Sequence, residues 1–393
     1  MGLNILFVTP YIPSPVRVRS YAFIRELAAR GHRITLVCLE QPAWENKYLP
    51  EIAPYCQEIH PIYLDQWKSY FNCLASLPTV TPLSVAFCRS SRGRKVIEAL
   101  LQNGSYDLIH TEFVRAAPLT ADLNGHPKVF DAVDSLSLTY RRCLSAPYVS
   151  PFQRLLALAE WLKMRRFEPL ILHQFDQVLV SSSADGRALQ DAGCDQPCLV
   201  TNGVDTSYFS FYDGPRHPET IVFLGKMSYY VNVASVLWFY HQVFPLIRRQ
   251  KPGVRLKIVG RNPVKKILSL TADKAVQVTG SVPDVRPHLC EALVSICPMV
   301  TGAGIKIKIL EAMAVGTPVV ATSLACQALQ VEPGREVLIG DSAEEFAAHV
   351  LDLLDNEYMR CRLTQNARHY LEEHHVWARV AEQLEAIYND LVS

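Results

Sequence analysis

The residues best suited to chemistry lie in one stretch, residues 301–322 (TGAGIKIKILEAMAVGTPVVAT). A strand pattern ends near Pro298, a glycine-rich loop follows, and an apolar helical pattern begins after the loop. Gly302 and Gly304 allow the backbone to approach a ligand closely, and the start of a helix offers unpaired N–H groups and a positive dipole end. The stretch therefore predicts an anion-binding loop at the start of a helix.

Two charged side chains follow this loop. Lys308 falls in the first turn of the expected helix and Glu311 three residues later, on the same helical face. A cation beside a carboxylate at an anion-binding helix end can hold both halves of a nucleoside diphosphate, Lys308 the phosphates and Glu311 the ribose hydroxyls. The alternative is a solvated Lys–Glu pair on an ordinary helix, worth about 0.2–0.5 kcal/mol.

The elements that must position these residues follow a regular alternation. Short β-branched runs alternate with longer amphipathic stretches, which is typical of parallel sheets covered by helices on both faces. Helices are expected at residues 21–29 and 233–249, and residues 342–391 are helical in pattern with no strand. Strands are expected at residues 4–8, 34–39, 107–109, 128–130, 177–180, 198–200, 220–224, 255–259, 275–279, 294–298 and 318–322.

The alternation is interrupted at residues 202–218, where Asn, Gly, Asp, Ser and Pro accumulate as in a linker. The expected fold is therefore α/β, with two Rossmann-like domains whose parallel sheets face an interdomain cleft. The expected boundaries are 1–207 for the first domain, 208–375 for the second, and 376–393 for a last helix that packs back on the first domain.

Length and composition agree with two ordinary globular domains. The chain has 393 residues, and 39 basic against 38 acidic side chains leave a net charge of +1, which does not favour a nucleic-acid partner. The 11 cysteines form no Cys-x-x-Cys pair and no zinc spacing, as expected of free thiols in a reducing compartment. No basic leader and no apolar run of about 18 residues is present, so a cytoplasmic protein is expected.

Several enzyme classes lack their motifs here. Residues 9–13, after the first strand, contain no glycine, which argues against a nicotinamide-dependent oxidoreductase, and no P-loop is present. No Asp-x-Asp pair offers carboxylates to Mg²⁺ or Mn²⁺, so neither a metal nor another cofactor is expected.

Two regions of the first half allow two interpretations. Residues 67–96 mix aromatic side chains with a basic run, and residues 151–175 form a long helical pattern with Lys163, Arg165 and Arg166 close together. One interpretation is core packing with a solvated basic patch. The other is a surface in peripheral contact with an anionic inner membrane or with a lipid-linked acceptor.

The glycine-rich stretch resembles the donor-site helix of retaining GT-B glycosyltransferases of glycosyltransferase family 4. The resemblance is closest to bacterial exopolysaccharide sugar transferases with the loop pattern Gly-x-Gly-x-Lys-x-Lys-x-Leu-Glu-Ala-Met-Ala. It covers nearly the whole chain through an ordered series of short matches. These are residues 7–13 (FVTPYIP), 27–32 (LAARGH), 107–110 (DLIH), 202–205 (NGVD), 223–225 (FLG), 258–260 (IVG), 279–286 (TGSVPDVR) and 310–322 (LEAMAVGTPVVAT).

The resemblance implies transfer of a hexose-type sugar from a nucleotide diphosphate sugar to a saccharide or lipid-linked acceptor, with retention and without a metal. It implies that the first domain faces the acceptor and the second binds the donor. The donor-binding residues it implies are Lys226, Gly302, Ala303, Gly304, Ile305, Lys306, Lys308 and Glu311. The catalytic residues are Asp134, Lys308 and Glu311, and the acceptor-side residues are Arg17, His110 and Asp131, with Glu112 beside them at a strand end.

The chain departs from the family pattern at four of its positions. Ala303 stands where a first glutamate is frequent, and Lys226 and Val231 stand where Arg and Lys are frequent. Asp134 occupies the place of a histidine near the sugar. Two alternatives to transfer therefore stay open, a nucleotide-sugar 2-epimerase of the same fold and a non-catalytic sugar-nucleotide-binding assembly protein.

Overall fold

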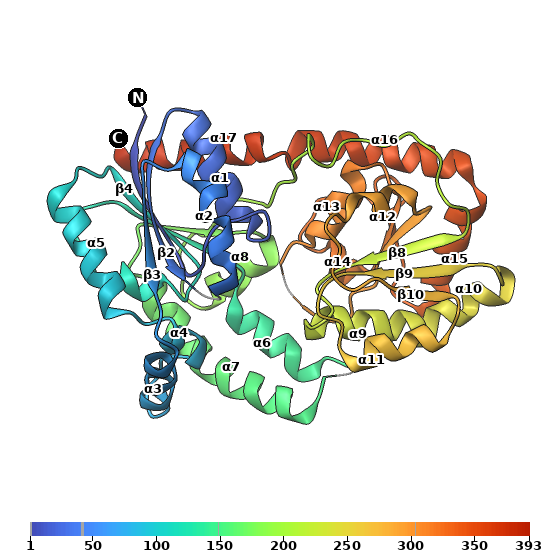
Figure 1. Ribbon diagram of the computed structural model, residues 1–393, viewed down its shortest axis with the longest axis horizontal. Helices are drawn as coiled ribbons and strands as arrows, with labels where there is room; N and C mark the ends of the chain where they lie inside the picture. Colours follow the sequence, from blue (N-terminus) through green and yellow to red (C-terminus); the bar gives the residue numbers. More distant parts are fainter. Residues whose placement is uncertain (1, 41–42, 148, 303) are drawn as a thin grey trace. The chain divides into compact units, whose positions relative to one another are not determined.

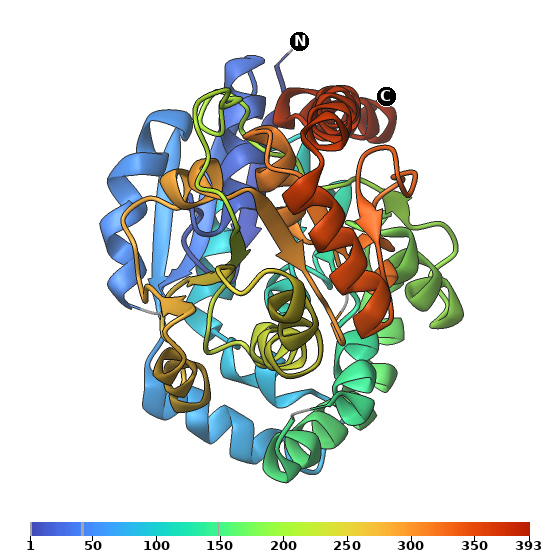
Figure 2. The same cartoon turned by 90° about the vertical axis from the view of Figure 1, so that its right-hand side faces the viewer.

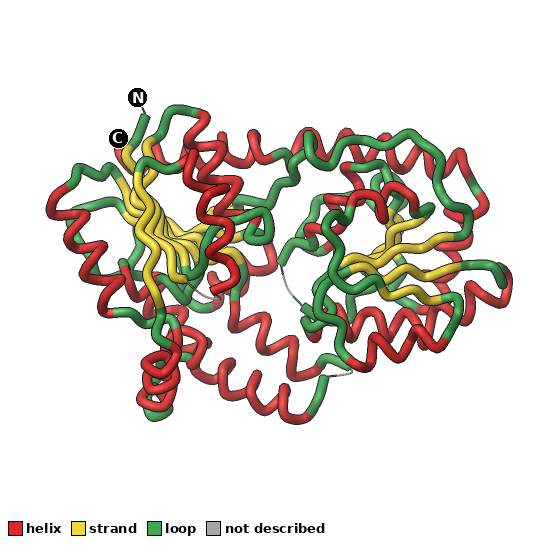
Figure 3. The backbone as a smooth tube through the Cα atoms, viewed as in Figure 1, coloured by secondary structure: helices red, strands yellow, loops and turns green. Residues whose placement is uncertain are grey.

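The computed structural model describes residues 2–40, 43–147, 149–302 and 304–393. The chain forms two compact units. Unit 1 consists of Met1–Arg141, Leu155–Asn202 and Trp377–Ser393, and unit 2 consists of Arg142–Arg154 and Gly203–Val376. Each unit contains one parallel sheet with helices on both faces (Figures 1 and 3).

The sheet of unit 1 has seven strands in the order β3-β2-β1-β4-β5-β6-β7, and its paired strands are parallel. Because β2 and β4 flank β1, the connections after β1 and β4 run in opposite directions between these two strands. The strands are β1 (Asn4–Thr9), β2 (Arg33–Glu40), β3 (Glu58–Tyr63), β4 (Leu108–Glu112), β5 (Lys128–Val133), β6 (Gln177–Val180) and β7 (Cys198–Leu199).

The helices of unit 1 bury the apolar side chains of this sheet. On one face, Phe23 of α1 (Val18–Ala29) and Trp377 of α17 (Trp377–Val392) meet with ring centroids 5.6 Å apart, in one core with Phe7 of β1. The last helix of the chain therefore packs in unit 1. The other helices are α2 (Leu49–Ile52), α3 (Gln66–Ser76), α4 (Leu83–Phe87), α5 (Ser91–Asn103), α6 (Leu136–Ser145), α7 (Pro151–Leu172) and α8 (Ser183–Asp191), with residues 142–154 of α6, α7 and the segment between them in unit 2.

The sheet of unit 2 has six strands in the order β10-β9-β8-β11-β12-β13. They are β8 (Thr220–Leu224), β9 (Arg255–Val259), β10 (Val276–Val278), β11 (Val294–Cys297), β12 (Val319–Ala321) and β13 (Leu338–Ile339). Helices α9 (Tyr230–Trp238), α10 (Phe244–Gln250) and α15 (Ala343–Asp355) pack on one face, and α13 (Ile307–Ala314) and α16 (Glu357–His374) on the other (Figures 1 and 2). Three short helices complete the unit: α11 (Lys265–Leu268), α12 (Arg286–Glu291) and α14 (Ser323–Cys326).

The strands expected from the sequence are confirmed, with ends that shift by at most three residues. Two edge strands were missed. β3 contains Pro61 and is mostly exposed, so its sequence lacks the apolar run of a buried strand, and β13 has only two residues. The helix expected at residues 233–249 is interrupted by a π-helical turn, Phe239–Val243. Pro245 follows this turn and has no N–H to continue the α-helical ladder.

Candidate functional site

The chemistry-bearing loop of unit 2 lies where the direction of the chain connections reverses. β8 and β11 are neighbours at the centre of the sheet, and the chain leaves β8 toward β9 on one side and β11 toward β12 on the other. Ligands of open α/β sheets bind at this switch point, beyond the carboxyl ends of the strands. The segment after β8 carries Lys226 and Asn232, and the segment after β11 carries the glycine-rich loop and Lys308.

The glycine-rich loop has the backbone that its sequence predicts. Gly302 and Gly304 have φ values of 107° and 71°, in the region that favours glycine. A methyl group on Gly302 would lie 3.0 Å from Cγ1 of Val231, so the side chain at the position of the missing family lysine supports the loop from below. The Lys306 ammonium donates to the Gly304 carbonyl at 3.0 Å. Ala303 lies outside the described residues.

Lys308 and Asn232 join the two segments of the switch point. The Lys308 Nζ atom donates to Oδ1 of Asn232 at 2.8 Å and lies 4.1 Å from the centre of the Phe223 ring. The Asn232 amide nitrogen in turn donates to the backbone carbonyl of Lys226 at 3.1 Å. Asn232 therefore fixes both the catalytic cation and the turn after β8.

Burial brings both charged groups of α13 close to neutral pH. Burial lowers the pKa of Lys308 to about 8, and the Lys306 cation lowers it further while Cys297 and Glu311 oppose the change. Burial raises the pKa of Glu311 to about 7, against the pull of the Lys308 cation. A cation and a carboxylate that are both desolvated before a ligand arrives are typical of a binding site and not of a solvated surface pair. The arrangement favours the nucleotide-binding interpretation of this helix.

Sequence reasoning missed two residues that hold this site. Asn232 is a polar side chain in an apolar helical run, and that was its only sequence signal. Arg142, at the end of α6, donates to the Gly302 carbonyl at 2.7 Å and to Oε1 of Gln327 at 3.3 Å. Nothing in the sequence near Arg142 points to a loop 160 residues away. Of the predicted donor residues, Lys226 is exposed and Ile305 is buried.

The carboxyl edge of the sheet in unit 1 holds the predicted acceptor-side residues. Arg17 follows β1, pairs with Glu45 at 3.1 Å and covers the Tyr11 ring at 4.6 Å. Asp134 follows β5, is half-buried, and accepts a hydrogen bond from the Ser181 hydroxyl at 3.0 Å. Arg17 and Asp134 are thus the two predicted residues of unit 1 that retain exposed surface.

Asp131 and His110 lie elsewhere than expected, inside the core. Asp131 is fully buried and pairs with buried Arg19 at 2.6 Å, and the Arg19 guanidinium also donates to the backbone carbonyls of Val200 and Thr201. His110 is fully buried against Phe7 and bonds the Tyr388 hydroxyl at 2.7 Å, and burial lowers its pKa to about 4. As neither side chain is exposed, an acceptor-side contact for these two residues is not supported, and their placement is structural.

The buried ion pair instead shapes the turn that carries Asp134. Val133 has a φ of 62°, and the Asp134 N–H bonds the Ala132 carbonyl at 2.8 Å, which closes a three-residue turn that is rare and strained for a β-branched residue. The Asp131 carboxylate accepts the Val133 N–H at 3.1 Å. Arg19 and Asp131 therefore position the Asp134 backbone through this turn.

Glu112 ends β4 at the switch point of unit 1. It is buried, and burial together with the nearby Asp131 carboxylate raises its pKa to about 7. Its surroundings resemble those of Glu311 in this respect, but its side chain has almost no exposed surface.

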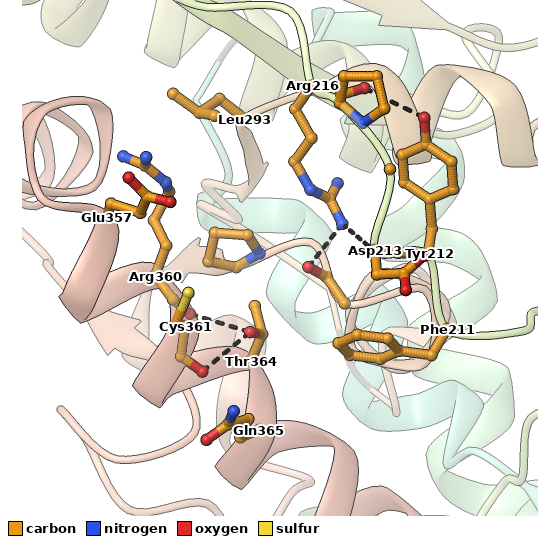
Figure 4. A pocket seen from close by; sticks show the side chains of 14 residues that line it. Phe211, Tyr212, Asp213, Arg216, Leu293, Glu357, Arg360, Cys361, Thr364 and Gln365 are labelled. Carbon is orange, nitrogen blue, oxygen red and sulfur yellow. Dashed lines mark hydrogen bonds between the residues drawn. The ribbon is translucent and has the colours of Figure 1, made fainter.

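A pocket of about 470 Å³ lies at the opposite, amino-terminal edge of the sheet of unit 2 (Figure 4). Its most polar side chain is Arg216, whose guanidinium donates to the carbonyls of Leu289, Cys290, Ala292, Tyr212, Val315 and Gly316 and to the Thr317 hydroxyl. Since its donors are already engaged by backbone carbonyls, Arg216 joins chain segments, and the pocket is not part of the site above.

Two searches over the described residues gave no further site. No group of three or more His, Cys, Asp or Glu side chains is placed to hold a metal ion. None of the helices, within the residues that the structure describes, is both long and apolar enough to cross a membrane.

Comparison with known families gives two matches that together span most of the chain. Residues 16–208 match the family described as Glycosyltransferase Family 4, and residues 218–356 match the family described as Glycosyl transferases group 1. The chain is 22% identical to an uncharacterized 44.6 kDa protein in the cps region of Klebsiella pneumoniae, with 89% of each chain covered. It is 26% identical to the phosphatidyl-myo-inositol mannosyltransferase of Mycobacterium leprae, with 100% of this chain and 98% of that protein covered.

Solved structures share the fold over the full length. Sucrose-phosphate synthase from Thermosynechococcus elongatus superposes with a TM-score of 0.71 at 16% identity, and 99% of each chain is covered. HepE from Anabaena, solved in complex with UDP and glucose, superposes with a TM-score of 0.65 at 15% identity, over 99% of this chain and 100% of that chain. The two parallel sheets, the family matches and these structures agree: the chain belongs to glycosyltransferase family 4, within the group 1 glycosyl transferases, and is a glycosyltransferase with the GT-B fold.

Proposed function

We propose that this glycosyltransferase takes a hexose-type sugar from a nucleoside diphosphate sugar bound at the switch point of unit 2. The observation that carries the proposal is the desolvated Lys308–Glu311 pair beside a glycine loop. Lys308 contacts the diphosphate and Glu311 accepts hydrogen bonds from the ribose hydroxyls. The structures of HepE with UDP and with UDP-glucose support a nucleotide sugar as the donor.

The chemistry follows from the leaving group. Breaking the anomeric bond places negative charge on the departing diphosphate, and a fixed cation and the loop N–H groups stabilise that charge as it develops. Each such donor is commonly worth about 3–4 kcal/mol in the transition state. Since Lys308 and Lys306 supply positive charge, the proposal needs no metal ion.

The proposed stereochemical outcome is retention. The departing phosphate takes the proton of the acceptor hydroxyl on the same face of the sugar, so no separate base is required. Asp134, held by Ser181, accepts hydrogen bonds from sugar hydroxyls in this scheme.

The proposed acceptor is a saccharide or a lipid-linked saccharide of exopolysaccharide synthesis. The cps-region relative and the phosphatidyl-myo-inositol mannosyltransferases support acceptors of these kinds.

A thermal-shift panel of UDP, GDP, TDP and ADP sugars tests donor binding. A ligand at 100 times its Kd is expected to stabilise the protein by about 2.7 kcal/mol. Lys308→Ala should remove most of this shift, whereas Lys266→Ala, a change at an exposed lysine of unit 2, should leave it intact. An unchanged shift in Lys308→Ala would move the diphosphate to another site.

Three product measurements test the rest. NMR of the product anomer separates retention from inversion, and transfer in excess EDTA tests the absence of a metal. UDP-GlcNAc incubated with the enzyme alone separates the activities: a 2-epimer would identify an epimerase. Nucleotide binding without transfer or hydrolysis would contradict the proposed catalysis.

A further inference from the structure

Helix α3 of unit 1 has its polar and apolar faces the wrong way round for a helix that packs on a protein core. Its inward side chains are Ser69, Asn72, Cys73 and Ser76, which are small or polar. The Asn72 amide donates to the Arg89 carbonyl and the Cys73 thiol to the Leu83 carbonyl. Polar bonds to neighbouring segments therefore hold α3 in place, and little apolar burial contributes.

The opposite side of α3 is apolar and faces outward. Trp67, Tyr70, Phe71, Leu74 and Leu77, at helical spacing, form what we call the α3 apolar face; their exposures are 83%, 55%, 71%, 64% and 57%. Helix α3 lies at an end of unit 1, beyond β3 (Figure 1). A contiguous apolar surface of this kind is rare on a protein without a partner for it.

Helix α7 continues this surface. The Lys163 ammonium donates to the carbonyls of Ser76, Leu77 and Thr79, which joins α7 to the end of α3. Leu162, next to Lys163, is 47% exposed. The apolar surface thus includes side chains of two helices.

The charges around the α3 apolar face have one sign. Residues 66–97 contain Lys68, Arg89, Arg92, Arg94 and Lys95 and no acidic residue. On α7, Arg165 and Arg166 are exposed. The two carboxylates of α7 are buried: Glu160 accepts the backbone N–H of Leu83, and Glu168 that of Leu136. The charge that this surface presents to a partner is therefore positive, although the chain as a whole carries only +1.

A pocket of about 570 Å³ lies beside this surface. It is lined by Arg89 and Arg115 together with the apolar side chains of Val85, Phe167 and Ile171. Cations next to an apolar wall match a lipid phosphate with its acyl chain.

We infer that the α3 apolar face docks on a lipid bilayer that contains anionic phospholipids. The aromatic side chains insert at the level of the headgroups, and Lys68, Arg92, Arg165 and Arg166 contact lipid phosphates. Helix α3, about 16 Å long at 1.5 Å per residue, lies in the plane of the interface and does not cross the membrane. A second copy of the chain fits this surface less well, because two like faces would bring the same positive charges together.

Co-sedimentation with vesicles tests this inference on the full chain without any donor. The vesicles contain phosphatidylcholine alone or with about one third phosphatidylglycerol, at low salt. The wild type should bind the anionic vesicles and much less to the neutral ones. Removing the cations in Lys68→Gln, Arg92→Gln and Arg165→Gln should weaken binding about fivefold per residue.

The variant Trp67→Ser/Phe71→Ser/Leu74→Ser should lose at least tenfold in vesicle binding. Tyr358→Ser is the matched control, because Tyr358 is 76% exposed on α16 of unit 2 and should not affect binding. The changed side chains are all exposed, and an unchanged melting temperature checks the fold. Nucleotide-induced thermal shifts should be unaffected in every variant, so failure here leaves the proposed function standing.

Two results would overturn the inference. One is equal vesicle binding by the wild type and the triple serine variant. The other is a wild type that ignores both kinds of vesicle but sediments as a dimer, with the triple variant a monomer, which would assign the α3 apolar face to a second copy of the chain.

Discussion

The switch points of the two sheets hold charged pairs of the same kind in opposite states. In unit 1, Arg19 and Asp131 are fully buried at 2.6 Å, and backbone carbonyls occupy further guanidinium donors. In unit 2, Lys308 and Glu311 are half-buried, with pKa values displaced toward neutrality by burial. The first pair is complete without a ligand, whereas the second is desolvated and improves when a diphosphate and a ribose arrive.

This difference separates charges that hold a fold from charges that bind a ligand. A buried pair with all its bonds made fixes a strained turn, as Asp131 does for Val133. A pair that burial penalises lowers the stability of the free protein, and ligand binding offsets the penalty. The contrast predicts opposite responses to the same substitutions in the two units.

The largest effect is expected from Arg19→Ala. Removing one partner of a buried ion pair leaves Asp131 unpaired, which costs about 3–5 kcal/mol. Urea unfolding of the variant measures this loss, and nucleotide binding in unit 2 should stay within about twofold wherever the variant is folded. Arg25→Ala, which removes a partly exposed pair with Glu26, is the control and should cost less than about 1 kcal/mol. A loss in Arg19→Ala no larger than in the control would remove the contrast between the two pairs.

Lys308→Ala should have the next largest effect, but on catalysis and not on folding. Losing one charge-stabilising donor lowers kcat/KM by about 100- to 1000-fold. The free protein should be as stable as the wild type or more so, because a penalised buried cation is gone. Steady-state kinetics beside Lys266→Ala measures the change, and wild-type kcat/KM in Lys308→Ala would show that this cation does not contact the reacting diphosphate.

Donor binding should depend on pH on both sides of neutrality. Lys308 must carry its proton to attract phosphate, so affinity falls as pH rises above about 8, approaching tenfold per pH unit. Glu311 must be ionised to accept from the ribose, so affinity also falls as pH drops below about 7. Calorimetric titration with the nucleoside diphosphate from pH 5.5 to 9.5 measures both limbs. In Glu311→Gln the acid limb should vanish and the alkaline limb should move to lower pH, since the carboxylate no longer raises the pKa of Lys308; a profile identical to the wild type would contradict both assignments.

The smallest effect, and the sharpest test of the contrast, is the stability of Glu311→Gln. The folded pKa of Glu311 is raised from 4.5 to about 7, so the wild type loses stability relative to the variant as pH rises from 4.5 to 7. At pH 8 the variant should be more stable by about 1 kcal/mol, or about 2–4 °C in Tm, and at pH 4 the two should agree. Asp131→Asn, the same chemical change in unit 1, should destabilise at pH 8. Destabilisation by both substitutions would mean that the two carboxylates do the same work.

The sequence determined most of the fold and the centre of the donor site. Strand runs, the linker at residues 202–218 and the glycine loop before Lys308 and Glu311 are local patterns, because propensity, turn chemistry and helical spacing act over a few residues. Edge strand β3 escaped since an exposed strand with a proline lacks the apolar run by which the others were found.

The tertiary structure decided which polar residues serve the site and which serve the core. His110 and Asp131 follow the same kind of sequence pattern as true site residues, yet packing against Phe7 and Arg19 buries them completely. Asn232 and Arg142 reach the donor loop across 76 and 160 residues of sequence. Burial and long-range pairing depend on where the whole chain places its segments, so no window of the sequence contains them.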